Sequence, residues 1–193
     1  GKIMTQTITG NVHYGRALVD QSMHFKQTHK VVWEYVANSL EYIDEITEKA
    51  EVKVTTSSPN RSIEIMDNGT GMTRKMLADN FFTLFGENIL RKKGKIARGK
   101  YGTGKAACFG IAEDLEIITV SNGLLNHVSL NRSEAIKTSD SFPIKDIKVN
   151  IPTDQKNGTK IIIKNIYPKI KIKKKNIVDF INNEISFENK FQS

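Results

Sequence analysis

The sequence has little cysteine: Cys108 is the single one in 193 residues. One thiol excludes a disulfide framework and a cysteine-ligated zinc site, and it fits a reducing compartment, so we expect a cytoplasmic location. No apolar run approaches the roughly 18 residues that a membrane-spanning helix needs. The sequence also has no basic segment followed by an apolar run, so no secretory signal is visible. Hydrophobic residues make up 38% of the chain, which is enough for a globular core.

Acidic residues are scarce relative to basic ones. There are 21 Asp and Glu against 29 Lys and Arg, which gives a formal net charge of +8. Two segments without any acid carry most of this excess, Arg91–Lys105 and Lys164–Lys175. Such clusters are either solvated surface or binding sites for a polyanion. The glycines within the first cluster favour phosphate binding there.

Hydrophobic periodicity predicts one α+β domain spanning residues 1–193, with a core at about 15–170 and a basic segment and helix at 164–193. Gly1–Thr9 shows no clear periodicity. The expected helices are Gly15–Gln27, Lys30–Lys49, one capped by Thr73 that runs to about Phe82, Gly102–Ala112 and Ile177–Ile185. The expected strands are Glu51–Ser57, Arg61–Asp67, Leu115–Val120, Leu124–Leu130, Ile144–Ile151 and Thr159–Ile166.

The first chemical motif lies on the expected helix Lys30–Lys49. Glu34, Asn38 and Glu41 are spaced i, i+4, i+7, which places them on one face, apart from the apolar stripe that begins at Val32. A carboxylate and an amide on one face can orient a water and hold Mg²⁺, because magnesium prefers hard oxygen ligands. A solvated helix face is the structural alternative.

A second motif, Asp67-Asn68-Gly69-Thr70-Gly71, directly follows an expected strand. A carboxylate at a strand end followed by glycines lets a flat ligand approach the backbone closely. The alternatives are a plain turn or a calcium loop. A calcium loop is excluded, because its twelfth position, counted from Asp67, should be acidic and is Ala78 here.

The third motif, Gly99 to Ala106, matches a P-loop only in part. Ala106 stands where a P-loop needs a hydroxyl for Mg²⁺, and no buried strand precedes the motif. The glycines nonetheless lead into an expected helix, where backbone N–H groups and Lys105 can bind phosphate. Cys108 is most simply a small core residue of that helix.

The order of these motifs resembles one superfamily. A helix with E-x-x-x-N, a strand with D-x-G-x-G, a lid-like loop, G-x-x-G-x-G and a late Asn157-Gly158-Thr159 are similar to the Bergerat-fold ATPases. That group includes gyrase B, the ninety-kDa heat-shock chaperones, histidine kinases and MutL. The resemblance covers about Lys30–Ile166 and implies a two-layer α/β sandwich, with a mixed, largely antiparallel sheet and helices on one face. It also implies that Mg·ATP binds between the layers.

The resemblance assigns a role to each motif. Glu34 would be the general base and Asn38 the Mg²⁺ ligand. Asp67 would bind the adenine amino group. Glu41 departs from the Asp of many members, which leaves its contact open. Leu77–Arg98 would be the lid. The other nucleotide-binding residues would be Gly69, Gly71, Met72 and Thr159, and the phosphate loop Gly99, Lys100, Tyr101, Gly102, Thr103, Gly104 and Lys105.

The motif details favour the branch similar to heat-shock protein 90 and MORC proteins. No histidine is followed by an acid, so histidine autokinase activity is not expected. The resemblance implies slow hydrolysis coupled to lid closure and homodimerisation, in the N-terminal fragment of a longer protein without a membrane partner. Three alternatives stay open: a nucleic-acid-binding module acting through Lys164–Lys175 with a vestigial nucleotide site, a scaffold that uses ATP only as a switch, and a true P-loop enzyme.

Overall fold

The computed structural model describes residues 4–9, 26–43, 49–77, 104–137 and 141–192. Seven strands among them form one sheet in the order β1-β6-β5-β4-β7-β3-β2, and every pairing is antiparallel. The expected largely antiparallel sheet of an α+β sandwich is confirmed. The strands are β1 (Met4–Thr9), β2 (Val52–Ser57), β3 (Ser62–Asp67), β4 (Ala112–Ser121), β5 (Leu124–Asn131), β6 (Ser141–Pro152) and β7 (Gly158–Ile166).

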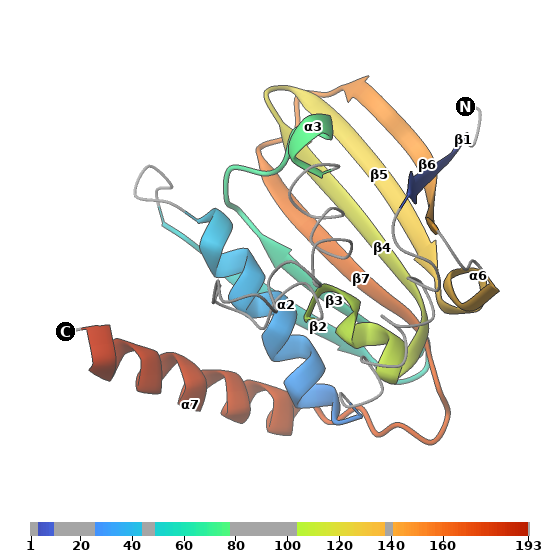
Figure 1. Ribbon diagram of the computed structural model, residues 1–193. Helices are drawn as coiled ribbons and strands as arrows, with labels where there is room; N and C mark the ends of the chain where they lie inside the picture. The colour runs from blue at the N-terminus through green and yellow to red at the C-terminus, as the bar shows by residue number, and fades with distance from the viewer. Residues whose placement is uncertain (1–3, 10–25, 44–48, 78–103, 138–140, 193) are drawn as a thin grey trace, which may run out of the picture.

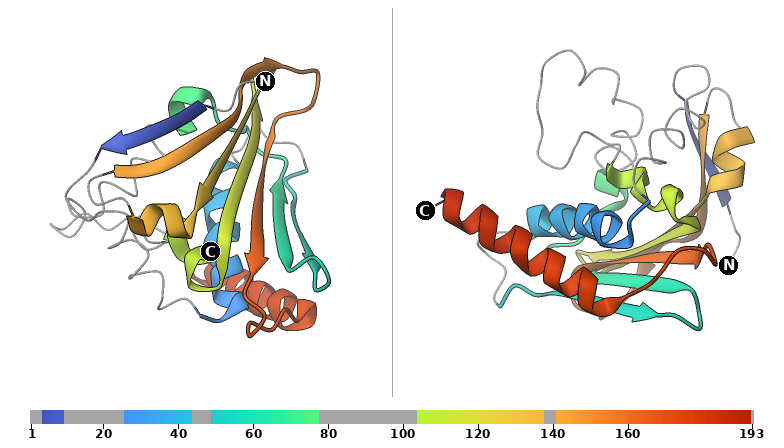
Figure 2. Two further views of the ribbon diagram at one scale, coloured as in Figure 1. Left: turned by 90° about the vertical axis from the view of Figure 1, so that its right-hand side faces the viewer. Right: turned by 90° about the horizontal axis from the view of Figure 1, so that it is seen from below.

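A helical layer lies against this sheet (Figure 1). Its main helix, α2 (Thr28–Tyr42), contacts β2, β3, the 3-10 helix η2 (Gly104–Gly110) and α7 (Lys174–Gln192). The view from below in Figure 2 shows α2 and η2 on one side of the strands. Two short helices complete the described elements, α3 (Arg74–Met76) and α6 (Arg132–Lys137). Within the described ranges, no helix is long and apolar enough to cross a membrane.

The strands β3, β4 and β7 bury alternate residues toward the helical layer. On β3, for example, Ile63, Ile65 and Asp67 are buried while the residues between them are partly exposed. Tyr35 and Phe109 are the largest fully buried side chains that the helical layer adds to this core. Period-two alternation in the sequence therefore identified both the strands and their inward face.

The helix that carries the first motif is shorter than expected. It ends at Tyr42 rather than Lys49, and Ile43 is already extended, with φ −92° and ψ 102°. The last turn contains no basic residue. The chain continues as Asp44-Glu45, and negative charge at a helix C-terminus opposes the helix dipole. The prediction of a longer helix rested on the apolar stripe alone, which does not include this electrostatic cost.

Several other boundaries differ from the expectations. β1 was not predicted: it is an edge strand that pairs with β6, and Met4 and Ile8 are its only large apolar residues, so its apolar pattern is weak. The helix α6 was not predicted. The expected helix at Gly102–Ala112 forms as the 3-10 helix η2, and α7 extends well beyond Ile177–Ile185 at both ends. The Thr73 cap is confirmed, since its Oγ1 accepts from the Met76 N–H at 3.1 Å. Gly15–Gln27 lies outside the described residues except for its last two, which are not helical.

An ion pair fastens the segment after the second motif to the sheet. Arg74 of α3 donates through both terminal nitrogens to the carboxylate of Asp146 on β6, at 2.5 and 2.6 Å. The Asp146 side chain is only 3% exposed and that of Arg74 is 24% exposed. Such a bidentate contact fixes the direction in which the chain leaves the motif.

Replacing Arg74 by alanine should therefore destabilise the fold. The Arg74→Ala variant leaves the buried Asp146 carboxylate without this partner, and we expect a loss of about 2–3 kcal/mol of unfolding free energy in urea denaturation. Lys164→Ala is the matched control, because it breaks the more exposed Lys164–Glu116 pair and should cost less than about 1 kcal/mol. Equal losses in the two variants would contradict this role for the Arg74 pair.

Candidate nucleotide site

A row of polar side chains crosses the central strands at one end of the core. Asp67 of β3 is in register with Thr159 of β7, and Thr159 is in register with Thr119 of β4. All three are buried, with exposures of 4%, 4% and 0%. Each one occupies the inward position next to a row of buried apolar residues on its own strand. The packed core therefore gives way to hydrogen-bonding groups at this end of the sandwich.

The two threonines form a hydrogen-bonded pair that holds the loop after β3. The Oγ1 atoms of Thr119 and Thr159 are 2.9 Å apart, and Thr119 Oγ1 accepts from the Met72 N–H at 2.8 Å. Asn68 secures the start of the same loop, because its side chain accepts from the Glu51 N–H at 2.7 Å and donates to the Lys49 carbonyl at 2.9 Å. The loop is thus fixed at both of its ends.

Gly71 brings this loop into direct contact with the backbone of β4. Its φ of +67° lies in the left-handed region, where side chains are strained. A Cβ atom at this position would lie 1.9 Å from the Val120 carbonyl oxygen. Glycine is therefore required here by conformation and by space, as expected where a backbone must pass closely.

Asp67 is held by donors from three parts of the chain. Its Oδ1 accepts from the Gly69 N–H at 3.0 Å, and the Ser39 side chain and the Thr159 backbone also donate to the carboxylate. Burial nevertheless raises the pKa of Asp67 above its ordinary value, because desolvation outweighs these donors. The carboxylate thus remains a strong acceptor in a site where water is scarce.

Glu34 and Asn38 lie on the facing helix, each 5% exposed. They are one turn apart on α2, and the next residue, Ser39, is the one that reaches Asp67. The Nδ2 atom of Asn38 is buried and has no hydrogen-bond partner among the described residues. A buried amide without a partner is costly, so a ligand group at this place would satisfy it.

The donor set fits a magnesium–nucleotide complex better than a metal held by protein alone. Within the described residues, no three His, Cys, Asp or Glu side chains form a metal-binding group. Magnesium commonly takes only one or two protein oxygens and completes its shell with phosphates and water. Asn38 supplies one oxygen donor of that kind, and Glu34 lies one helical turn away on α2.

The phosphate-loop residues are described only in part. Gly99 to Thr103 and most of the expected lid lie outside the described residues, while Gly104 and Lys105 begin η2. η2 is tied to α2, because the Cys108 N–H donates to the Tyr35 hydroxyl at 3.1 Å. Cys108 is fully buried as expected, and burial raises the pKa of its thiol to about 12.

Three contributors to the site were missed in the sequence: Ser39, Asn68 and Thr119. Thr119 did carry a signal, because in Leu115–Val120 it is a polar residue at a position where the alternation calls for an apolar one. Ser39 and Asn68 carried none, since their roles depend on contacts with segments far along the chain.

Comparison with known proteins agrees with this geometry. Residues 26–165 match the family described as histidine kinase-, DNA gyrase B-, and HSP90-like ATPase. The chain belongs to this family. The heat-shock-protein-90-like branch expected from the motifs is also supported, because the curated relatives below are chaperones named HtpG. Membership supports ATP binding and ATPase activity at the level of the family.

The relatives are longer proteins. Chaperone protein HtpG of Alkaliphilus metalliredigens is 29% identical over 131 residues, which cover 56% of this chain and 21% of the chaperone. HtpG of Natranaerobius thermophilus is 30% identical over 122 residues, or 58% and 18% of the two chains. HtpG of Clostridium botulinum is 26% identical over 130 residues. The matched part therefore spans about a fifth of these relatives' length.

The close approach at Gly71 in this ATPase-family domain leads to a matched pair of substitutions. Gly71→Ala should cost more than the roughly 1–2 kcal/mol of left-handed strain alone, because its Cβ overlaps the Val120 carbonyl. Gly123→Ala carries similar strain at φ +74°, but its Cβ would meet nothing nearer than 3.8 Å. In thermal or urea unfolding, Gly71→Ala should therefore be clearly less stable than Gly123→Ala. A Gly123→Ala variant that is the less stable of the two would refute the packing argument.

Proposed function

We propose that this domain binds Mg·ATP between its helix and sheet layers and hydrolyses it slowly. The observation that carries the proposal is the burial of Glu34, Asn38 and Asp67 at one interface, where Ser39 links α2 to the strand end. Buried polar groups away from a ligand are costly, so this concentration is characteristic of a functional site.

Asp67 would recognise the adenine base. Its buried carboxylate is an acceptor at the polar end of the core, and an exocyclic amine supplies the donor that matches it. Gly69, Gly71 and Met72 would line the base, and Thr159 would lie beneath it, since the threonine pair fixes the loop that carries Met72. The base would thus bind a surface that the fold has already ordered.

Hydrolysis would use Glu34 as the general base. A water oxygen attacks the γ-phosphorus, Glu34 takes the proton, and the bond from the γ-phosphorus to the bridging oxygen breaks, so that ADP leaves with the electron pair. Mg²⁺ held by Asn38 and the phosphates would offset the negative charge that develops. The loop Gly99–Lys105 would donate N–H groups and the Lys105 charge to the phosphates.

Lid closure and homodimerisation would couple this chemistry to a partner. The lid would be Leu77–Arg98, of which only Leu77 is described, buried at 1% exposure. Slow turnover follows if a closed lid and a second copy are needed to complete the site. The relatives' chaperone names make action on a protein partner part of this proposal for the chain.

A second candidate function rests on Lys164–Lys175, which lies outside the nucleotide motifs. The domain would then bind nucleic acid, and its nucleotide site would be vestigial or act only as a switch. Tyr167 is the one aromatic residue of the cluster, and it already bonds with Glu113 and Arg132, which argues against base stacking. Duplex affinity that falls steeply with salt would favour this alternative.

Removal of the base should separate binding from turnover. Glu34→Gln keeps the size and hydrogen-bonding capacity of the side chain but not its basicity. We expect ATP affinity near that of the wild type and hydrolysis reduced by roughly 10²–10⁴-fold in a phosphate-release assay. Glu134→Gln, at an exposed position on α6, is the control and should keep full turnover. Undiminished hydrolysis in Glu34→Gln would rule out Glu34 as the base.

Removal of the adenine acceptor should abolish nucleotide binding without harming the fold. The folded-state pKa of Asp67 is raised, so its ionisation costs stability once pH exceeds about 4, the ordinary pKa of an aspartate. Asp67→Asn removes this cost, and its stability relative to the wild type should improve between about pH 4 and neutral pH. Denaturation across that range checks the stability, and titration with a non-hydrolysable ATP analogue checks the binding. The exposed Asp154→Asn is the control. Wild-type nucleotide affinity in Asp67→Asn would disprove the adenine contact.

A further inference from the structure

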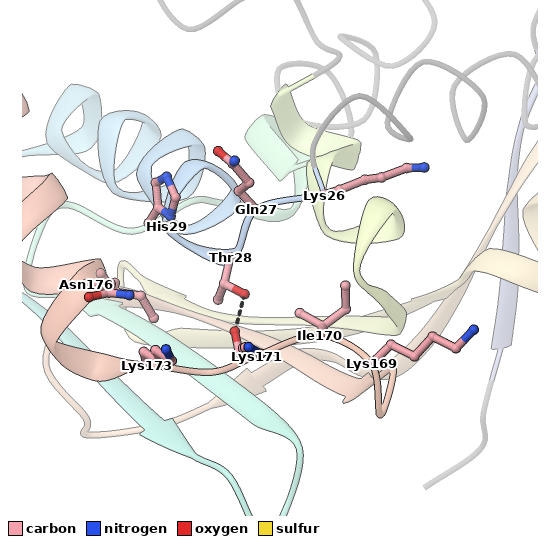
Figure 3. A pocket seen from close by; sticks show the side chains of 10 residues that line it. Lys26, Gln27, Thr28, His29, Lys169, Ile170, Lys171, Lys173 and Asn176 are labelled. Atoms are coloured by element: carbon pink, nitrogen blue, oxygen red, sulfur yellow. Dashed lines mark hydrogen bonds between the residues drawn. The ribbon is translucent and has the colours of Figure 1, made fainter.

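A pocket of about 260 Å³ lies at the N-terminal ends of α2 and α7 (Figure 3). Ten of the described residues line it, and none of these ten is acidic. Four are lysines, contributed by the segment before α2 and by the connection from β7 to α7. They are Lys26, Lys169, Lys171 and Lys173. Figure 3 shows the Lys26 and Lys169 side chains extending in the same direction at one side of the pocket.

The lysines are held by a rigid framework. Ile170 and Ile172 pack against the core, so the alternate residues Lys169, Lys171 and Lys173 face outward. The Thr28 hydroxyl donates to the Lys171 carbonyl at 2.8 Å, which joins this connection to the first turn of α2. Arg61 donates to the carbonyls of residues 166, 167 and 170 and so fixes the connection from below. The positive charges are thus presented on an ordered backbone.

Both helix ends add to the positive potential. The partial positive charge of a helix N-terminus favours acids in the first turn, yet neither α2 nor α7 has one there. Cations occupy those turns instead, including Lys30 on α2 and Lys174 on α7. Burial and the charge of Lys30 together lower the pKa of His29, which lines the same pocket. This arrangement costs free energy unless an anion binds.

Among the described residues, the pocket lysines lack the ion pairs that some other basic residues have. Lys164, in the same basic run, pairs with Glu116, which His127 contacts as well. Within the described residues, no ion pair involves Lys26, Lys169, Lys171 or Lys173. Four uncompensated ammonium groups around a small cavity match an anion that carries several charges in a compact volume. Phosphate groups have that property, and lysine binds them as a point charge.

We propose that this pocket is a second anion site, which binds phosphate groups independently of the nucleotide site. The ligand class is a compact anion with two or more phosphates, either free or as part of a phosphodiester backbone. Base stacking is not part of the proposal, because none of the described residues that line the pocket is Phe, Tyr or Trp, and His29 already packs on Phe180 of α7 with ring centroids 4.7 Å apart. Neither ATP hydrolysis nor Asp67 enters this proposal.

Titration calorimetry with inorganic pyrophosphate tests the site on the full chain. The Lys171→Gln/Lys173→Gln variant should bind pyrophosphate roughly tenfold or more weakly than the wild type, since two charge-assisted contacts are lost. Lys137→Gln/Lys148→Gln removes the same charge at exposed positions away from the pocket and should change the affinity little. Equal weakening in the two double variants would overturn the proposal, because it would reflect net charge alone.

Two further measurements separate this site from the nucleotide site and identify the source of the phosphate. The pocket variant should keep its affinity for a non-hydrolysable ATP analogue, and Asp67→Asn should keep its pyrophosphate binding. If the pocket variant lost binding of both pyrophosphate and the ATP analogue, the two sites would not be independent. A short DNA duplex that displaces pyrophosphate from the wild type, but not from the pocket variant, assigns the site to a nucleic-acid backbone. No displacement assigns it to a free phosphate-bearing anion.

Discussion

The rest of the structure depends on how the carboxylate of Asp67 is buried. A carboxylate that is 4% exposed needs donors, and here they come from the following turn, from Ser39 on α2 and from the Thr159 backbone on β7. This one side chain therefore links the helix, the sheet and the loop. The donors do not fully offset the desolvation, since the pKa of Asp67 stays raised. The site retains an acceptor that a ligand can satisfy, at some cost to the stability of the free domain.

Two close contacts between backbone segments shape the site around the Asp67 carboxylate. Gly71 lies on the Val120 carbonyl, and a Cβ at Gly158 would lie 2.4 Å from the Asp67 carbonyl oxygen. The two glycines allow the loop and the start of β7 to pack at distances that no side chain permits. The polar row of Asp67, Thr159 and Thr119 then lies at one end of the apolar core, on the strands β3, β7 and β4, and α2 packs against β3. The lysine pocket lies instead at the N-terminal end of α2, so one helix separates two regions of opposite character.

Local patterns in the sequence predicted most strands and the main chemical groups. Alternation found β3, β4 and β7, and the spacing of Glu34 and Asn38 placed both on one helix face, where both are buried. Non-local features were missed. The register that sets Asp67 beside Thr159, and the hydrogen bond from Ser39, depend on strand pairing that no local pattern encodes. β1 was missed because Met4 and Ile8 are its only large apolar residues. The end of α2 was misplaced because the apolar stripe carries no information about charge at the helix terminus.

The strand order has a consequence for how the protein is made. β1 pairs only with β6, and β3 obtains its inner neighbour only when β7 is available, so early strands must wait for late ones. Long-range pairing of this kind slows folding and leaves edges unprotected while the chain emerges from the ribosome. Asp67 acquires Thr159 only after nearly all of the sheet has been synthesised. The candidate site therefore cannot form before β7 has been synthesised.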